Sequence, residues 1–366
     1  MLLYKGSREQ ILESLQSVCG IVEKRNTLAI LSNVYLEKDE GRLTMLASDI
    51  DIQIRTNVTT EPSERTTLTV GARKLQDVLR SLPEGEVSLV FEDNRLQIKM
   101  GRSRFNLQTM EADTYPRMLL SDGEQTRLKL GQGKFKRLLS RVQYAMALQD
   151  IRYYLNGLLL VVRNNEICAV ATDGHRLAFV REALEEEQPN IEVILPRKTV
   201  LELSRQLTEN DDPLEISLTQ TQAQFRFGNV ELISKLIDGK FPDYQRVIPS
   251  ENTKCVILER QSLLQSLLRV KILTVEKVPG IRLIFSNNSL RILGSNTERE
   301  EAQEEIEISY AYPEIDVGFN INYLLDLLNN IHSEHFECYL GDASSSALFQ
   351  LQDNPDFKYV VMPMRV

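Results

Sequence analysis

Leu46-Ala47-Ser48-Asp49 recurs in related form as Val170-Ala171-Thr172-Asp173 and again as Leu293-Gly294-Ser295-Asn296. The spacing gives a repeat of about 122 residues, so the chain of 366 residues holds three copies. One hydrophobic core seldom serves more than roughly 100–200 residues, and three domains of about 120 residues are therefore expected.

Each copy has one amphipathic helix before this motif and a second helix after it. Phe135, Leu138, Leu139 and Val142 follow the i, i+3, i+4, i+7 spacing of a helix with one buried face. The predicted helices cover residues 7–22, 72–82, 134–144, 197–207, 261–273 and 320–331. The chain thus reads as six related half-units, a pattern that favours an arc or a ring.

The segments between the helices alternate apolar and polar residues, as in Val87–Phe91 and Arg95–Met100. Asp93-Asn94 and Asn287-Asn288 are typical of hairpin turns. The predicted fold class is α+β: three repeated domains, each of two helices and antiparallel sheets. Clusters of polar, turn-forming residues near 121–125 and 249–253 place the domains at 1–124, 125–252 and 253–366.

Composition excludes several classes of protein. The apolar content of 42% is that of a folded chain, and the longest apolar run, Leu158–Val162, has the length of a strand. The first residues contain no apolar leader, so neither a signal peptide nor a membrane span is expected. The four cysteines lie far apart and form no CxxC pair, which indicates buried free thiols in a reducing cytoplasm.

The net charge of −9 is unevenly distributed. The helical windows 7–25, 72–82, 133–145, 197–207, 260–274 and 319–331 hold 16 basic and 6 acidic residues, whereas the rest holds 27 basic and 46 acidic residues. Lys134, Arg137 and Arg141 share one helix face. Such a face is often merely solvated, but basic helices in an acidic chain suit a phosphate backbone bound without sequence preference.

Helix dimensions allow a ring around duplex DNA. Two chains would supply twelve helices, and a spacing of roughly 9–10 Å puts their axes on a circle about 35–38 Å across. Subtracting about 5 Å of helix radius on each side leaves roughly 25–28 Å, which exceeds the roughly 20 Å of a duplex. One chain could not close such a ring.

Four stretches in this order, Gln149–Gly157, Ala171–Leu177, Asp238–Tyr244 and Tyr359–Arg365, resemble the beta sliding clamp family of bacterial DNA polymerase III. The resemblance covers the whole chain; Ala29, where the family usually has Pro, is a departure at a structural position. It implies a cytoplasmic, non-catalytic processivity factor without a cofactor. It further implies a head-to-tail homodimer around double-stranded DNA that tethers the DNA polymerase III alpha subunit, the clamp loader, and other polymerases and repair proteins that carry clamp-binding motifs.

The resemblance also assigns DNA-binding residues. These are Arg25, Arg73, Gln149, Tyr153 and Tyr154. The two arginines would meet phosphates, while Gln149 and the tyrosines would touch backbone or an exposed single strand. Core packing beside Leu155 is the other reading of the tyrosines, and adjacent aromatics point differently, so one of them is expected to be partly buried.

A pocket for partner peptides is implied as well. Its residues are Leu155, Thr172, His175, Arg176, Leu177, Pro242, Arg246, Val247, Val360, Met362 and Met364. Val360, Met362 and Met364 alternate, which would put them on one face of a terminal edge strand, where Pro363 is tolerated. Methionines at period two are also a common core pattern. Thioethers adapt to different apolar anchors, so Leu or Phe of a short linear motif would insert there.

The resemblance places a dimer contact between domain one and domain three of two copies. Its residues are Lys74, Arg102, Arg104, Phe105, Leu107, Ile272, Leu273, Glu298, Glu300, Glu301 and Glu304. Opposite charges on two different edges suit a head-to-tail contact, although an acidic run by itself is usually a solvated strand.

An enzyme is the competing class. Asp173-Gly174-His175 could suggest acid–base chemistry, but Asp-Gly is first a hairpin turn and no nucleophile motif accompanies it. His332 and His335 stand three apart without a third metal ligand, and the chain has neither a P-loop nor an HExxH motif. A DNA-binding protein that forms no ring, or a metal-dependent nuclease, is the alternative function.

Overall fold

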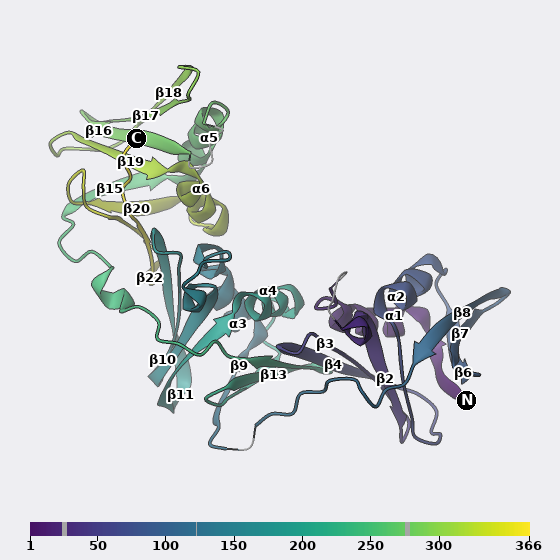
Figure 1. Cartoon of the computed structure of the whole chain (residues 1–366). Helices are drawn as coiled ribbons and strands as arrows, with labels where there is room; N and C mark the ends of the chain where they lie inside the picture. Colours follow the sequence, from purple (N-terminus) through teal and green to yellow (C-terminus); the bar gives the residue numbers. More distant parts are fainter. Residues whose placement is uncertain (24–27, 122, 275–278) are drawn as a thin grey trace. The chain divides into compact units, whose positions relative to one another are not determined.

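The computed structural model describes residues 1–23, 28–121, 123–274 and 279–366. The chain divides into two compact units (Figure 1). The first comprises Met1–Lys136 and Leu201–Leu236, and the second comprises Arg137–Val200 and Ile237–Val366. In the part of the chain that the structure describes there are six α-helices, and all sheet pairings are antiparallel.

The first unit is built on one twelve-stranded sheet with the order β1-β6-β7-β8-β5-β2-β3-β4-β14-β13-β12-β9. Its strands are β1 (Leu2–Ser7), β2 (Asn33–Asp39), β3 (Arg42–Ser48), β4 (Ile52–Thr59), β5 (Thr66–Gly71), β6 (Glu86–Glu92), β7 (Arg95–Met100), β8 (Ser103–Met110), β9 (Thr126–Gly131), β12 (Pro213–Leu218), β13 (Gln222–Phe227) and β14 (Val230–Lys235). The pairing of β4 with β14 joins strands of the first and second repeats into one sheet.

Helices α1 (Arg8–Cys19) and α2 (Ala72–Ser81) pack against each other, and α1 covers β3 and β4 (Figure 1). Helix α1 begins where the sequence supplies a cap, because the hydroxyl of Ser7 accepts hydrogen bonds from the amides of Glu9 and Gln10 at 3.1 and 3.4 Å. Its apolar stripe, which includes Leu15 and Val18, is fully buried.

The second unit contains two sheets. The six-stranded sheet has the order β10-β11-β22-β21-β20-β15, and the four-stranded sheet has the order β18-β17-β16-β19. Their strands are β10 (Gly157–Thr172), β11 (Arg176–Pro196), β15 (Lys254–Glu259), β16 (Gly280–Ser286), β17 (Ser289–Ser295), β18 (Glu301–Glu307), β19 (Ile315–Asn320), β20 (His335–Leu340), β21 (Ala347–Leu351) and β22 (Asn354–Val361). The pairing of β11 with β22 joins the second and third repeats.

Helices α5 (Arg260–Lys271) and α6 (Ile321–Asn330) pack together beside β17 and β18 (Figure 1). Glu259 caps α5 by accepting from two backbone amides at 2.7 and 2.6 Å, and Asn320 caps α6 at 2.9 Å. Helices α3 (Gln132–Ser140) and α4 (Arg197–Gln206) contribute residues to both units.

All six predicted helices are present, and the α+β class is confirmed. Helix α3 ends at Ser140 rather than at Tyr144, and a separate 3-10 turn follows at Gln143–Ala145. The predicted turns have the positive φ angles of hairpin turns, 50° and 56° at Asp93 and Asn94. Within the described ranges, no helix has both the length and the apolar character needed to cross a membrane.

Candidate functional site

A cavity of about 190 Å³ lies in the second unit, at the ends of β10, β11 and β22. Its lining is Arg152, Tyr154, Leu155, Thr172, Gly174, Arg176, Leu177, Phe241, Pro242, Tyr244, Val247, Val360 and Met362. Thr172 pairs with Leu177 across β10 and β11, and Leu177 pairs with Val360 across β11 and β22. Residues directly opposite each other share a sheet face, so these three side chains form one wall of the cavity.

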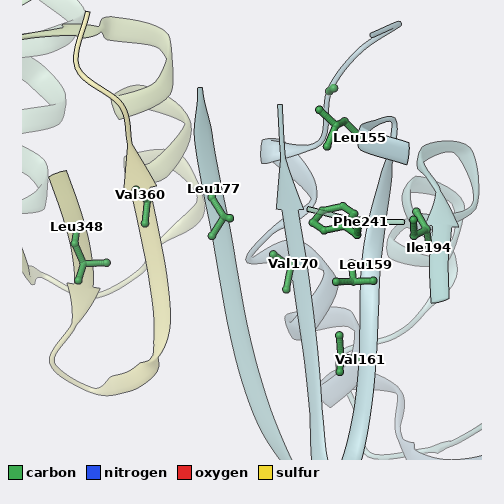
Figure 2. Close-up of a cluster of buried hydrophobic side chains, with 10 residues drawn as sticks. Leu155, Leu159, Val161, Val170, Leu177, Ile194, Phe241, Leu348 and Val360 are labelled. Atoms are coloured by element: carbon green, nitrogen blue, oxygen red, sulfur yellow. The ribbon is translucent and has the colours of Figure 1, made fainter. Parts of the chain in front are cut away.

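The cavity sits on a buried apolar cluster. Figure 2 shows Phe241 among Leu155, Leu159 and Val170, with Leu177 and Val360 on the neighbouring strands. Phe241 is 8% exposed and Leu155 is 1% exposed, so both are fixed by packing. A cavity with such a rigid apolar base can desolvate an apolar side chain at little cost in ordering.

The mouth of the cavity is more adaptable. Met362 is 44% exposed, and its backbone amide donates a hydrogen bond to the carbonyl oxygen of His175 at 2.9 Å. This bond fixes the chain while leaving the flexible thioether free to rotate. The methionine can therefore fit its contacts to different apolar anchors.

Arg176 links the cavity to helix α6. Its guanidinium donates to Asp173 at 3.1 Å, to Asp326 of α6 at 2.5 Å and to the carbonyl oxygen of Tyr144 at 2.6 Å. It also lies over the ring of Tyr323, 4.6 Å from the centroid. Arg176 is only 9% exposed, so this cation is paired as a buried charge must be. Arg176 thus holds the second and third repeats together within this unit.

A short loop beside the cavity carries exposed apolar side chains, with Leu148 76% and Ile151 97% exposed. The loop is nevertheless held firmly. The amide of Asp150 donates to the Asn156 side chain, whose amide group donates back to the Asp150 carbonyl oxygen, both at 2.8 Å. The Arg152 guanidinium bonds the carboxylate of Asp150 and lowers its pKa to about 2.

Eight of the eleven predicted pocket residues line the cavity, and three do not. His175 contributes its carbonyl oxygen to the Met362 bond, and Arg246 is exposed and paired with Asp243 at 2.9 Å. Met364 lies away from the cavity, where its amide donates to the carbonyl oxygen of Gly318 in the four-stranded sheet at 2.9 Å.

The prediction of a terminal edge strand is wrong. Strand β22 ends at Val361 and lies between β11 and β21 inside the sheet, and Pro363 follows the strand. Alternation cannot distinguish an edge strand from an inner one, because both have a side-chain period of two. Met362 still lines the cavity with Val360, as predicted, whereas Met364, further beyond the end of the strand, does not.

The cavity also contains residues that the sequence did not assign to it. Phe241 and Tyr244 come from the end of the second repeat, and Arg152 comes from the exposed loop. Phe241 and Tyr244 belong to Asp238–Tyr244, one of the four stretches that carry the family resemblance. Which sheet face this segment covers depends on tertiary structure and could not be predicted from the stretch alone.

The predicted DNA-binding residues occupy different surroundings. Arg25 lies outside the described residues. Arg73 is exposed on α2, and its guanidinium donates to the carbonyl oxygen of Val22 at 2.8 Å. Gln149 is exposed at a positive φ of 56°, and Tyr153 is 58% exposed. Tyr154 is half-buried and lines the cavity, so one tyrosine of the pair is partly buried, as expected.

The predicted dimer residues lie on two sheet edges, one in each unit. In the first unit, Ser103–Gln108 of β8 pair, among the described residues, only with β7, because β5 pairs with β8 only at Thr109 and Met110. In the second unit, β18 is the last strand of the four-stranded sheet. Both segments therefore present unpaired backbone groups.

Each edge alternates between half-buried and exposed side chains. Phe105 and Leu107 are half-buried on β8, while Arg104 is exposed, as are Arg102 before the strand and Lys74 on α2. Near β18 the exposed residues are Ile272, which is 70% exposed, and Glu298, Glu300 and Glu301; Leu273 is half-buried. Glu304 differs, because Arg269 of α5 binds its carboxylate at 2.5 Å and lowers its pKa.

Comparison with known proteins decides the family. Models of the DNA polymerase III beta subunit match the chain in succession: the N-terminal domain at 4–119, the central domain at 129–243 and the C-terminal domain at 245–365. The chain belongs to this family, the beta sliding clamps. Its three clamp domains correspond to the three repeats.

Individual relatives agree with this assignment along the whole chain. The beta sliding clamp of Pseudomonas aeruginosa is 43% identical over 362 residues, and that of Escherichia coli is 39% identical over 362 residues, each alignment covering 98% of both chains. The crystal structure of the DNA polymerase III subunit beta from Pseudomonas aeruginosa has a TM-score of 0.95 at 42% identity and covers 100% of both chains. The clamp structure from Caulobacter crescentus has a TM-score of 0.91 at 34% identity, covering 99% of this chain and 100% of that one.

A sliding clamp is the non-catalytic processivity subunit of DNA polymerase III, and the residues weighed for catalysis fit that role. Asp173-Gly174-His175 forms the β10–β11 turn, in which Gly174 has φ 90° and the Asp173 carboxylate accepts from the amides of His175 and Arg176 at 2.9 and 3.1 Å. Among the described residues no cluster of three or more His, Cys, Asp or Glu could hold a metal ion. The nuclease alternative has no support.

Proposed function

We propose that this clamp closes into a head-to-tail dimer in which β8 of one copy pairs with β18 of the other. The two free, oppositely charged edges carry this proposal. An exposed strand edge is a template for further pairing, and Arg102 and Arg104 would face Glu298, Glu300 and Glu301. Because the two edges are different surfaces of the chain, the contact is heterologous. Two copies can use both edges of each chain only if the dimer closes into a ring.

The ring would encircle double-stranded DNA without reading its sequence. Exposed helix cations such as Arg73 and Arg137 would meet phosphates, and Arg25 would join them. Gln149 and Tyr153 protrude on the firmly held loop and would touch backbone or an unpaired strand. Three domains at 1–124, 125–252 and 253–366 would repeat this arrangement, and the clamp would act in the cytoplasm.

The apolar cavity would hold a short linear motif of the partner proteins. Its rigid base of Leu155, Leu177 and Val360 suits a Leu or Phe anchor, and Met362 at the mouth suits anchors of differing shape. The partners would be the DNA polymerase III alpha subunit, the clamp loader, and other polymerases and repair proteins. A sliding clamp from Pseudomonas aeruginosa has been crystallised bound to griselimycin, which supports a ligand site on clamps of this kind.

Retention on circular and linear duplex DNA tests the ring. After loading by a cognate clamp loader at moderate salt, a topologically linked ring stays on circular DNA and is quickly lost from linear DNA. Ordinary electrostatic binding would depend on salt but not on DNA ends. Equal loss from both forms would therefore contradict the proposal.

A further inference from the structure

A second cavity adjoins the apolar one in the same unit and is larger, at about 640 Å³. It lies over the same face of the six-stranded sheet, with lining residues from β10, β11, β20, β21 and β22 and from the segment 244–252. Tyr244 lines both cavities, and its ring stacks on Phe179 with centroids 5.8 Å apart and planes 24° apart. The Tyr244–Phe179 pair is therefore the boundary between the two cavities.

The strand face changes from apolar to charged across this boundary. On β11 the side chains step by two residues from Leu177 in the apolar cavity to Phe179 and then to Arg181 in the larger one. On β22 they step from Val360 to Lys358. Residues i and i+2 lie on one face and are roughly 6.5–7 Å apart, so the larger cavity directly continues the apolar cavity.

The charges of the larger cavity are not all compensated. Arg181 binds Glu166 at 3.1 Å and also pairs with Asp356, and Arg163 pairs with Glu192. Lys358 differs: no carboxylate of the described residues lies within ion-pair distance of it. Lys358 stands opposite Phe179 in the β11–β22 register, is half-buried and lines the larger cavity, so its side chain begins beside the boundary.

We propose that this larger cavity is an acid-selective extension of the peptide site. A partner segment whose apolar anchor fills the cavity at Leu177 and Val360 would pass over Tyr244 and place a carboxylate near Lys358. An extended chain rises roughly 3.3 Å per residue, so the acidic residue would stand two or three residues from the anchor. The side-chain amide of Gln350 also lines the cavity and would bond the peptide backbone. The inference rests on the proposed use of the apolar cavity.

Cys168 does not give this cavity a reactive role. The thiol is half-buried, and burial raises its pKa to about 11. Since the thiolate is the nucleophilic form, this side chain is inert at neutral pH. The larger cavity is thus suited to recognition by contact and charge.

The test uses fluorescein-labelled synthetic peptides with a Leu-Phe anchor and the full-length clamp, with fluorescence polarisation as the readout. In one pair of peptides Glu or Lys stands two residues after the anchor, and in a second pair it stands two residues before it. In one of the pairs the Glu peptide should bind about two- to fivefold more tightly than the Lys peptide, as expected for a half-exposed ion pair. The difference should shrink as salt is added.

Variants assign the effect to Lys358. Lys358→Gln should remove the Glu preference, and Lys358→Glu should reverse it. Lys129→Glu is the matched control, because it makes the same charge change at an exposed residue of β9 that does not line the cavity. It should leave the preference intact.

Two outcomes would overturn the inference in distinguishable ways. In the first outcome all peptides bind, and Met362→Ser lowers the affinity of each by the same factor, but the Glu and Lys peptides do not differ in affinity in either pair. The acid-selective extension is then wrong while the apolar site stands. If no peptide binds, or Met362→Ser has no effect, the apolar site itself is wrong and the inference falls with it.

Discussion

Replacing Arg176 with Met should loosen the junction that it holds within the second unit. The substitution keeps a long apolar stem and removes four hydrogen bonds, which the guanidinium donates to Asp173, Asp326, the Tyr359 hydroxyl and the Tyr144 carbonyl oxygen. Removing one member of a buried ion pair costs about 3–5 kcal/mol, because the remaining charge is left unpaired. The side chain of Asp326 is 41% exposed and can rehydrate, so the lower end of that range, about 3 kcal/mol, is expected.

Local hydrogen exchange measures this loss directly, since a multidomain chain need not unfold in one step. A loss of about 3 kcal/mol corresponds to roughly 150-fold faster exchange of protected amides in α6 and at the start of β11. Arg181→Met is the matched control. Arg181 lies on the same strand and also has two carboxylate partners, but its side chain is 42% exposed. Each exposed pair contributes about 0.2–1 kcal/mol, so losing both should raise exchange by roughly 30-fold at most, well below the effect expected for Arg176→Met. Equal effects of the two variants would refute the role given to burial.

Three further outcomes are expected. Leu273→Asp should give monomers in size-exclusion chromatography with light scattering, because a carboxylate would enter the proposed apolar and acidic edge; a dimer at the same concentration would contradict the interface. Met362→Ser should lower the affinity for a Leu-Phe peptide by about fivefold, since burial of a half-exposed thioether contributes about 1 kcal/mol. An unchanged affinity would contradict the pocket assignment. The pKa of Asp150 lies below its ordinary value, so its bond to Arg152 supports the loop above about pH 4 and is lost as the pH falls towards 2. Exchange of the loop amides, corrected for intrinsic rates, should rise over that interval and not between pH 5 and 9.

The repeats and the helices could be predicted from the sequence because each depends on local periodicity. The pocket residues were instead implied by the family resemblance of four contiguous stretches, and eight of the eleven line the cavity. The helix beginnings follow from caps at Ser7, Glu259 and Asn320, which the chain itself supplies. The position of Met364 could not be predicted, because it depends on where β22 ends against Gly318 of a distant strand. The pairing of Arg269 with Glu304 could likewise not be predicted, since it joins residues 35 positions apart on different elements.

The segments at the ends of the first and second repeats show why an apolar cavity forms beside the second segment, whereas the cavity beside the first is charged. Both boundary segments place an aromatic residue before a proline, Tyr115-Pro116 and Phe241-Pro242. Both aromatics are buried, at 4% and 8% exposure. Tyr115, however, has a hydroxyl that accepts from the amide of Ser48 and donates to a backbone carbonyl oxygen, each at 3.1 Å. Phe241 has no such bonds and is held by packing alone.

The neighbouring cavities differ accordingly. The cavity beside the first boundary, about 300 Å³, is lined by Arg65, Arg117 and Asp113 together with Tyr35. An apolar anchor placed there would strip water from charged groups without offering them hydrogen bonds, at a cost of several kcal/mol. The cavity beside Phe241 presents Leu155, Leu177 and Val360 instead, and an anchor gains burial without that penalty. Duplicated architecture therefore supplies two similar boundaries, and the polarity of a few side chains makes the cavity beside Phe241 the better fit for an apolar anchor.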